Sequence, residues 1–220
     1  MAGQPTAPSL RCEGETWAPD PALVYPRSSP VTAWILHLDH VIRTWIVMHR
    51  VPWLDNVMLS VSAVGRGGMG WVAISLALLV RRRIRWQQFA RLLAALLMVA
   101  LIADTFLKPA FGRDRPFLST PRITVIGQRL ADASFPSGHA ATSVAGAIII
   151  SSFVPRLWPA WLLIACAVGY SRIYLGVHYP LDVAAGAIVG GIIGLLTVAY
   201  ERHLVHRARN RRINSAARQR

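Results

Sequence analysis

The stretch VAAGAIVGGIIGLLTVAY, from Val183 to Tyr200, contains no charged side chain. A helix needs about 20 predominantly apolar residues to cross the hydrocarbon core of a bilayer, so this stretch predicts a membrane span. Its glycines recur at spacings of three and four residues, a pattern that lets a neighbouring helix approach closely. The glycines that we interpret as packing positions are Gly186, Gly190, Gly191 and Gly194.

Four further apolar blocks predict additional crossings of the membrane, at residues 66–82, 89–107, 140–154 and 158–175. The composition agrees, because 54% of the residues are hydrophobic and only 15% are charged, with a mean hydropathy of +0.40. A chain this apolar cannot cover itself with a polar surface, which argues against a soluble enzyme. We expect an all-α, polytopic membrane helix bundle with five or six transmembrane helices.

The residues before the first predicted crossing form two different segments. Residues 1–30 carry six of the 14 prolines and little apolar periodicity, which predicts a disordered Pro-rich tail. Residues 31–50 place apolar side chains at helical spacing among charged ones, which predicts an amphipathic helix in the interface plane. We therefore expect a tail at 1–30, a membrane domain at 31–201 and a basic cytoplasmic tail at 202–220.

The net charge of +14 comes largely from arginines that lie at the ends of apolar blocks. They cluster at residues 81–85 and 202–220, as charges that set membrane orientation do, so we do not interpret them as a nucleic-acid surface. If both clusters are cytoplasmic, the predicted spans alternate consistently. The N-terminus then lies outside, or inside if residues 31–64 contain a sixth crossing.

Three short segments carry polar and ionisable residues at the ends of predicted spans. They read KPAFGRDRP from Lys108 to Pro116, FPSGH from Phe135 to His139, and SRIYLGVHYPLD from Ser171 to Asp182. With the arginine clusters inside, all three segments face outward. Ionisable groups at the membrane edge are costly, which favours a functional interpretation over plain surface charge.

The residue types in these segments suit a phosphoryl group. Its oxygens gain negative charge as a bond breaks, so a catalyst surrounds it with fixed cations and N–H donors. Lys108, the chain's only lysine, Arg115 and Arg172 are candidate cations. Ser137 and Gly138 predict a turn whose N–H groups point at an anion where a helix begins.

A possible acid–base pair accompanies these cations. His178 and Asp182 are four residues apart, so in a helical turn they share a face and the carboxylate can fix the imidazole tautomer.

The other charged residues near the motifs have less specific interpretations. Asp104 stands four residues before Lys108 and either orients it or reaches the outer interface as a surface charge. The charges interpreted as belonging to the loop surface are Arg113, Asp114 and Arg129. The loop at residues 117–134 is long enough to fold over a head group as a lid.

The ordered set of motifs resembles the type 2 phosphatidic acid phosphatase family of membrane lipid phosphatases, over about residues 53–200. The family pattern is a Lys and an Arg-Pro, then Pro-Ser-Gly-His, then Ser-Arg followed by a His and an Asp, and every position is met here. The resemblance implies that His178 is the nucleophile, forming a phosphohistidine, that Asp182 orients it and that His139 protonates the leaving oxygen. The phosphate would be held by Lys108, Arg115, Ser137, Gly138 and Arg172, with Asp104 and Ser171 as possible supporting residues.

The same resemblance implies a substrate and a place in the cell. ADASFPSGH and SRIYLGVHYPLDV most resemble bacterial undecaprenyl-diphosphate phosphatases, which implies a lipid diphosphate substrate, a multi-pass protein of the bacterial inner membrane and an outward-facing site. Phosphatidic acid and phosphatidylglycerol phosphate are alternative substrates. No metal or other cofactor is implied, and the sequence has no carboxylate cluster of the kind that holds magnesium. A transporter or flippase of lipid phosphates is the non-enzyme alternative, although such proteins carry broken helices in repeated halves and this chain has no internal repeat.

Overall fold

The computed structural model of the chain describes residues 29–119 and 124–217. Within these residues all regular structure is helical, which confirms the predicted fold class. Three helical stretches are long and apolar enough to cross a membrane: Pro52–Val80, Trp86–Ser119 and Pro180–Arg211. The protein is therefore a multi-pass membrane protein. The tail predicted at residues 1–30 lies, except for its last two residues, outside the described residues.

Helix α2, Pro30–Met48, corresponds to the amphipathic helix predicted at residues 31–50. Its start follows from local chemistry, because a proline is pre-organised for the first turn and has no N–H that needs a partner. The Ser29 hydroxyl accepts the Thr32 N–H at 3.2 Å, as an N-cap does.

The first crossing is a broken helix that begins earlier than the predicted residues 66–82. It consists of α3, Pro52–Gly65, a 3-10 turn η1, Arg66–Gly68, and α4, Met69–Val80. Gly67 and Gly68 have φ values of 56° and 76°, a left-handed conformation that glycine adopts without strain. These two residues redirect the helix without ending the span, so the apolar stretch before them belongs to the same crossing.

The second crossing changes its helical pitch near its end. It begins as α5, Trp86–Ala100, continues as a π-helical segment η2, Leu101–Leu107, and ends as α6, Lys108–Phe111. Gly112, at φ 56°, terminates it by donating its N–H to the Lys108 carbonyl at 2.9 Å. A short helix α7, Pro116–Ser119, follows. π-Helical turns often lie at functional sites, and this one leads directly into the first motif.

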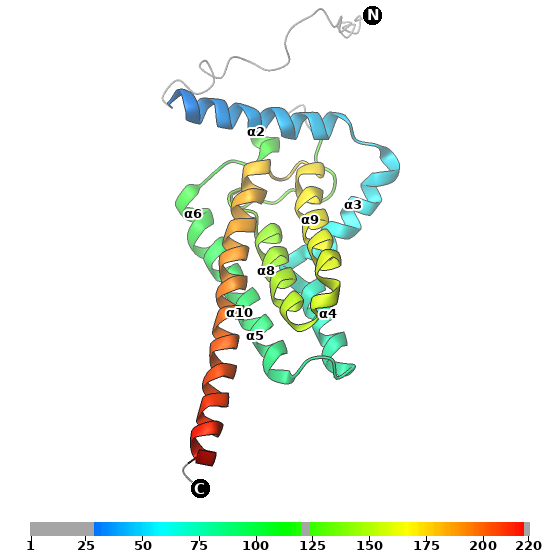
Figure 1. Cartoon of the computed structure of the whole chain (residues 1–220). Coiled ribbons are helices and arrows are strands. Elements are labelled where there is room, and N and C mark those ends of the chain that lie inside the picture. The colour runs from blue at the N-terminus through cyan, green and yellow to red at the C-terminus, as the bar shows by residue number, and fades with distance from the viewer. Residues whose placement is uncertain (1–28, 120–123, 218–220) are drawn as a thin grey trace, which may run out of the picture. The chain divides into compact units, whose positions relative to one another are not determined.

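The second motif lies at the start of helix α8, Gly138–Phe153, and the third motif begins at the end of helix α9, Trp158–Tyr174. Helix α8 contacts α5, α9 and α10 (Figure 1), and a short 3-10 turn η3, Pro155–Leu157, joins it to α9. With 16 residues, α8 is roughly 24 Å long at ~1.5 Å per residue, shorter than the ~30 Å hydrocarbon core. Its inward side forms the centre of the apolar core, where the side chains that are at most 1% exposed include Ala141, Ala145, Ile149 and Ile150.

Helix α10, Pro180–Ala217, packs closely against α8 through its glycines. A Cβ atom at Gly186 would lie 2.3 Å from the Ser137 carbonyl oxygen, and one at Gly190 would lie 2.0 Å from that of Ala141. These distances confirm the packing interpretation for Gly186 and Gly190. It is wrong for Gly191, where a Cβ would have a single neighbour, 4.0 Å away, because that position faces away from the close contact.

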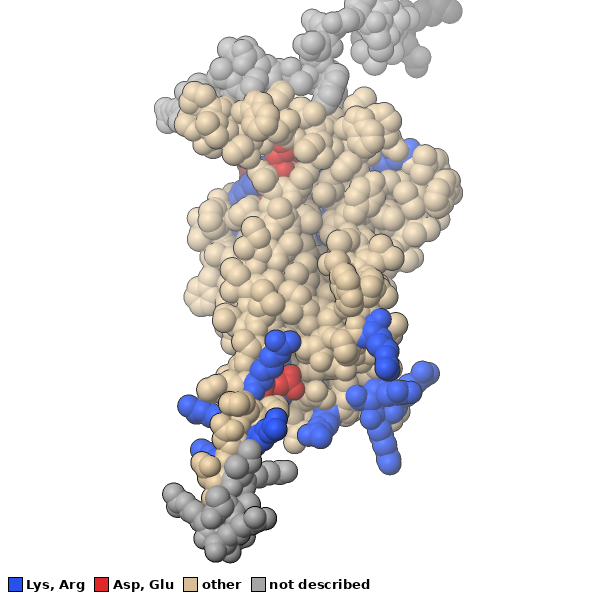
Figure 2. All heavy atoms as spheres, viewed as in Figure 1, with Lys and Arg blue, Asp and Glu red and all other residues tan. Residues whose placement is uncertain are grey.

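Positive charge gathers at the end of the helices opposite to the motifs. Arg81, Arg82, Arg83 and Arg85 lie exposed between α4 and α5, and the arginines of the C-terminal half of α10 extend the same basic region. Figure 2 shows this blue region at the lower end, below a broad surface with almost no charged side chains on the face in view. The three motifs lie at the other ends of α6, α8, α9 and α10 (Figure 1).

Candidate active site

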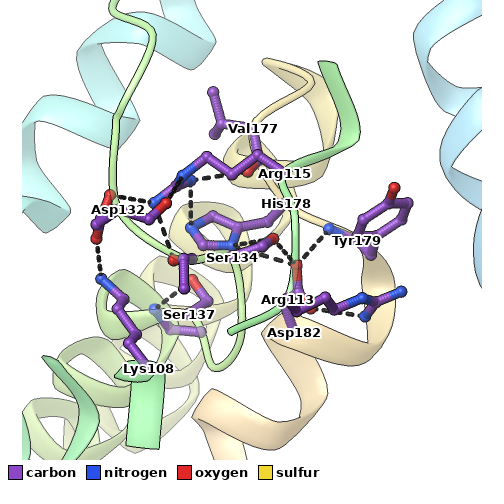
Figure 3. Close-up of polar contacts among 12 residues, drawn as sticks. Lys108, Arg113, Arg115, Asp132, Ser134, Ser137, Val177, His178, Tyr179 and Asp182 are labelled. Carbon is purple, nitrogen blue, oxygen red and sulfur yellow. Dashed lines mark hydrogen bonds and ion pairs between the residues drawn. The ribbon is translucent and has the colours of Figure 1, made fainter. Parts of the chain in front are cut away.

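His178 lies in the turn between α9 and α10 and is buried, with only 2% of its surface exposed. The four-residue spacing predicts that His178 and Asp182 share a helical face. Pro180 begins α10, however, so His178 precedes the helix and the two residues share no helical face. The two side chains meet across the turn, with His178 Nδ1 3.4 Å from Asp182 Oδ2 (Figure 3). The contact that the sequence predicted therefore exists, and the helix start at the proline is the reason for its different geometry.

Asp182 has no solvent exposure and is surrounded by donors. Its Oδ2 accepts the Tyr179 N–H at 2.9 Å and a short hydrogen bond from the Ser134 hydroxyl. Its Oδ1 pairs with Arg113 NH1 at 2.7 Å (Figure 3). The prediction that Arg113 is a surface charge is wrong, because its loop folds back over the start of α10. These contacts keep the carboxylate ionised and fixed beside the imidazole.

The other ring nitrogen of His178 faces a cation. Nε2 lies 3.4 Å from Arg115 NH1, which also donates to the Val177 carbonyl at 2.9 Å. Arg115 is only 1% exposed, so its guanidinium is held firmly. Burial lowers the pKa of His178 to about 4, although its hydrogen bond to Asp182 acts in the opposite direction. The imidazole is thus uncharged at neutral pH, and Nε2 can present a lone pair beside Arg115.

Asp132 bridges two of the predicted cations. Its Oδ2 is 2.5 Å from Lys108 Nζ and its Oδ1 is 2.7 Å from Arg115 NH2 (Figure 3). Asp104 completes the surroundings of Lys108, with its Oδ1 2.6 Å from Nζ. Burial alone would raise the pKa of Asp132, but Lys108 and Arg115 outweigh burial and lower this pKa to about 2.

Ser137 and Gly138 form the start of α8 as predicted from their turn chemistry. The buried Ser137 hydroxyl accepts the Ala140 N–H at 3.5 Å and caps the helix. A Cβ at Gly138 would lie 3.2 Å from Asp104 Oδ1, so the absence of a side chain lets the π-helical segment approach the helix start closely. The positive end of α8 therefore lies beside the groups that surround Lys108.

Arg172 and His139 line a cavity of about 180 Å³. Arg172 is 6% exposed, and its NH1 donates a short hydrogen bond to Ser62. Ser171 does not join the cluster through its side chain, because its hydroxyl donates to the Val168 carbonyl of its own helix at 2.6 Å. Among the described residues, no group of three or more His, Cys, Asp or Glu side chains could hold a metal ion.

Sequence reasoning missed Asp132 and Ser134 and misassigned Arg113. All three lie in irregular segments, where no periodicity says which way a side chain points. The only available signal is that Asp132 and Ser134 directly precede the FPSGH segment and Arg113 lies inside the KPAFGRDRP segment.

Comparison with known proteins places this arrangement in a family. A family model described as the PAP2 superfamily matches residues 88–205. The chain belongs to the PAP2 superfamily. The match begins later than the expected residue 53, since the first broken span lies outside it. Together with the membrane-spanning helices, this makes the chain a membrane lipid phosphatase of the PAP2 superfamily.

Individual relatives of this PAP2 protein carry different substrate names. It is 30% identical over 154 residues to an undecaprenyl-diphosphatase of Sulfolobus acidocaldarius, covering 70% of this chain and 73% of the relative. It is 33% identical over 145 residues to a lipid A 4'-phosphatase of Bacteroides thetaiotaomicron, covering 59% and 64%. The crystal structure of Aquifex aeolicus LpxE aligns with a TM-score of 0.65 at 29% identity, covering 74% of this chain and 96% of that one.

Proposed function

We propose that this PAP2 protein removes the terminal phosphate of undecaprenyl diphosphate, by way of a phosphohistidine at His178. The observation that carries the proposal is that the two ring nitrogens of His178 face groups of opposite charge. Its Nδ1 faces the buried Asp182 carboxylate while its Nε2 faces Arg115 NH1. A nucleophile held by an orienting acid on one side and by a phosphate-binding cation on the other suits phosphoryl transfer.

The reaction proceeds in two balanced steps. His178 Nε2 attacks the terminal phosphorus, the bond from phosphorus to the bridging oxygen breaks, and its electron pair stays on that oxygen, which receives a proton from His139. Water then attacks the phosphorus of the phosphohistidine and gives one proton to His139, the bond from phosphorus to His178 Nε2 breaks with its electron pair returning to the ring, and inorganic phosphate is released. Asp182 stabilises the positive charge that the His178 ring acquires, as the acid of a catalytic triad does.

The phosphate would be bound by Lys108, Arg115 and Arg172 and by the helix start at Ser137 and Gly138. Asp132 and Asp104 hold the Lys108 ammonium between two carboxylates, which fixes its position. Asp132 does the same for Arg115. These acids are positioning residues in the proposal, because they act on the substrate through the cations they hold.

A lipid monophosphate is the second candidate substrate. The observation that favours it is the 33% identity to a protein named lipid A 4'-phosphatase. The name undecaprenyl-diphosphatase belongs to a relative that covers more of this chain, and this supports the diphosphate. Phosphatidic acid and phosphatidylglycerol phosphate are the other monophosphates to compare.

The proposal is tested by phosphate release from a panel of pure lipids in detergent, with excess chelator present. The panel contains undecaprenyl diphosphate, undecaprenyl phosphate, phosphatidic acid and phosphatidylglycerol phosphate. We expect the highest kcat/KM on the diphosphate, and no loss of activity with chelator. Preference for a monophosphate would overturn the substrate assignment, and binding of the lipids without phosphate release would favour a transporter.

We expect Lys108→Arg to lower turnover several-fold although it keeps the charge. The Lys108 ammonium lies within 2.6 Å of Asp104 and 2.5 Å of Asp132. A planar guanidinium is larger and directs its donors differently, so it cannot occupy that position without moving a carboxylate. The measurement is kcat on the best substrate of the panel. Normal kcat in the variant would show that the site needs only a positive charge there.

The active site is expected to open on the outer face of the bacterial inner membrane. The arginines at the opposite ends of the helices, at residues 81–85 and beyond Glu201, favour a cytoplasmic position for that end. In a background with Cys12→Ser and Cys166→Ser, the exposed Leu118 is changed to Cys, and Arg209 in a second variant. An impermeant thiol reagent should label Leu118→Cys in intact cells and leave Arg209→Cys unlabelled. The reverse pattern would put the site in the cytoplasm.

A further inference from the structure

The break in the first span carries an arginine. The turn η1 begins at Arg66, in the middle of the stretch Pro52–Val80 that crosses the membrane. Charged side chains within spans are costly and usually mark a ligand pathway or a binding site. Arg66 belongs to none of the three motifs, but it lines the same cavity as His139 and Arg172.

This cavity is positively charged. Of the residues that line it, Arg66 and Arg172 carry charge, His139 is titratable, and the others are apolar or uncharged, such as Gln128. No carboxylate is among these described residues, whereas Lys108 and Arg115 elsewhere in the site are each paired with Asp132. Two arginines at a cavity that no carboxylate lines favour the binding of an anion there.

Arg172 provides an independent indication of a ligand. It is 6% exposed, and its Nε is buried without a hydrogen-bond partner among the described residues. A buried donor that lacks an acceptor is destabilising, and such groups usually find a partner in water or a ligand. An anion oxygen in the adjoining cavity would supply that acceptor.

The cavity is large enough for a phosphate group and is lined by His139, the proposed general acid. Its volume of about 180 Å³ corresponds to about six water molecules at ~30 Å³ each. His139 lines it, and so does Val177, which directly precedes His178 in the sequence.

We infer that this cavity binds the second phosphate of a lipid diphosphate, the one that stays on the lipid, with Arg66 as its principal cation and Gln128 as a further donor. The inference rests on the proposed function, because it places the terminal phosphate at His178. A diphosphate then spans the site, with its terminal phosphate beside Lys108 and Arg115 and with Arg172 between the two phosphates.

The role of Arg66 follows from the leaving group. When the bond from the terminal phosphorus to the bridging oxygen breaks, its electron pair remains on the lipid-linked phosphate, which gains negative charge until His139 protonates it. A cation beside that phosphate stabilises the transition state. A lipid monophosphate leaves as an alcohol without a second phosphate, so Arg66 has no partner there. Arg66 is therefore a specificity-determining residue for diphosphates.

The test compares Arg66→Gln with wild type on farnesyl diphosphate and farnesyl monophosphate, which share one lipid chain. A charge-assisted contact to phosphate predicts that the variant loses about 10- to 100-fold in kcat/KM on the diphosphate. On the monophosphate we expect less than about a threefold change, since no contact is lost. Arg81→Gln, at the opposite end of the helices, is the matched control and should leave the ratio of the two kcat/KM values unchanged.

An unchanged ratio in Arg66→Gln would overturn the inference, whether both activities fall together or neither does. If this variant does not purify as a folded protein, Arg66→Lys and Gln128→Ala are judged by the same ratio. A lower diphosphate preference in them supports the second phosphate site, and an unchanged ratio overturns it. A wild-type protein that releases phosphate from neither lipid would contradict the proposed function itself.

Discussion

Replacement of His178 by alanine should abolish phosphate release. The variant lacks the attacking nitrogen, and uncatalysed hydrolysis of phosphate esters is among the slowest reactions known. The side chain is almost fully buried beside Asp182 and Arg115, so a water molecule that fills its place would not be oriented for the same attack. We expect a residual kcat below a few per cent, roughly the limit seen when a nucleophile is deleted.

The control for His178→Ala is His203→Ala. His203 is exposed in the C-terminal half of α10, at the other end of that helix from Asp182. It should keep full activity and an unchanged thermal unfolding midpoint. Activity in His178→Ala above a few per cent of wild type, measured on folded protein, would rule out His178 as the nucleophile.

The second large effect is expected for Asp182→Asn, with kcat lowered by about 10³-fold or more, as for the orienting acid of a triad. The amide has nearly the shape of the carboxylate but no charge. It can no longer stabilise the imidazolium of His178, and its NH2 group faces either Ser134 and Tyr179 or Arg113, all of which donate to the carboxylate in the wild type. The loss should appear in kcat more than in KM, because the charge on the ring develops only during the reaction.

Asp104→Asn is the matched control for Asp182→Asn, since Asp104 is half-exposed and contacts Lys108. It should lower kcat far less. Thermal unfolding in detergent separates catalysis from folding, because leaving Arg113 without its anion is expected to cost about 1–3 kcal/mol of stability. Equal losses of activity in the two variants would show that Asp182 has no special role.

Much of the fold could be predicted because hydropathy reports directly on the membrane. The apolar blocks at residues 89–107 and 183–200 lie within the second crossing and α10. The predicted first crossing, at residues 66–82, starts too far along the sequence because the residues from Gly65 to Gly68 interrupt the apolar pattern. A sequence shows such an interruption but not that the helix resumes, and here two left-handed glycines allow it to continue.

The site was predictable where a residue lies at a helix end and was missed where it lies in a loop. Lys108, Ser137 and Asp182 are at or next to the ends of α6, α8 and α10, so their positions follow from the spans. Asp132 and Ser134 precede α8 in an irregular segment, where direction depends on tertiary contacts. No local rule indicates that a carboxylate there will bridge Lys108 and Arg115.

The central claim, a covalent phosphohistidine at His178, is tested most directly by trapping it. Wild-type protein is mixed with farnesyl diphosphate that carries a radioactive terminal phosphate, in excess chelator, and the reaction is stopped in alkali within one turnover. We predict a label that survives base, is lost in acid and maps by mass spectrometry to the peptide containing His178, and that is absent from His178→Ala. Steady turnover without any bound label, or a label on a different residue, would contradict the account.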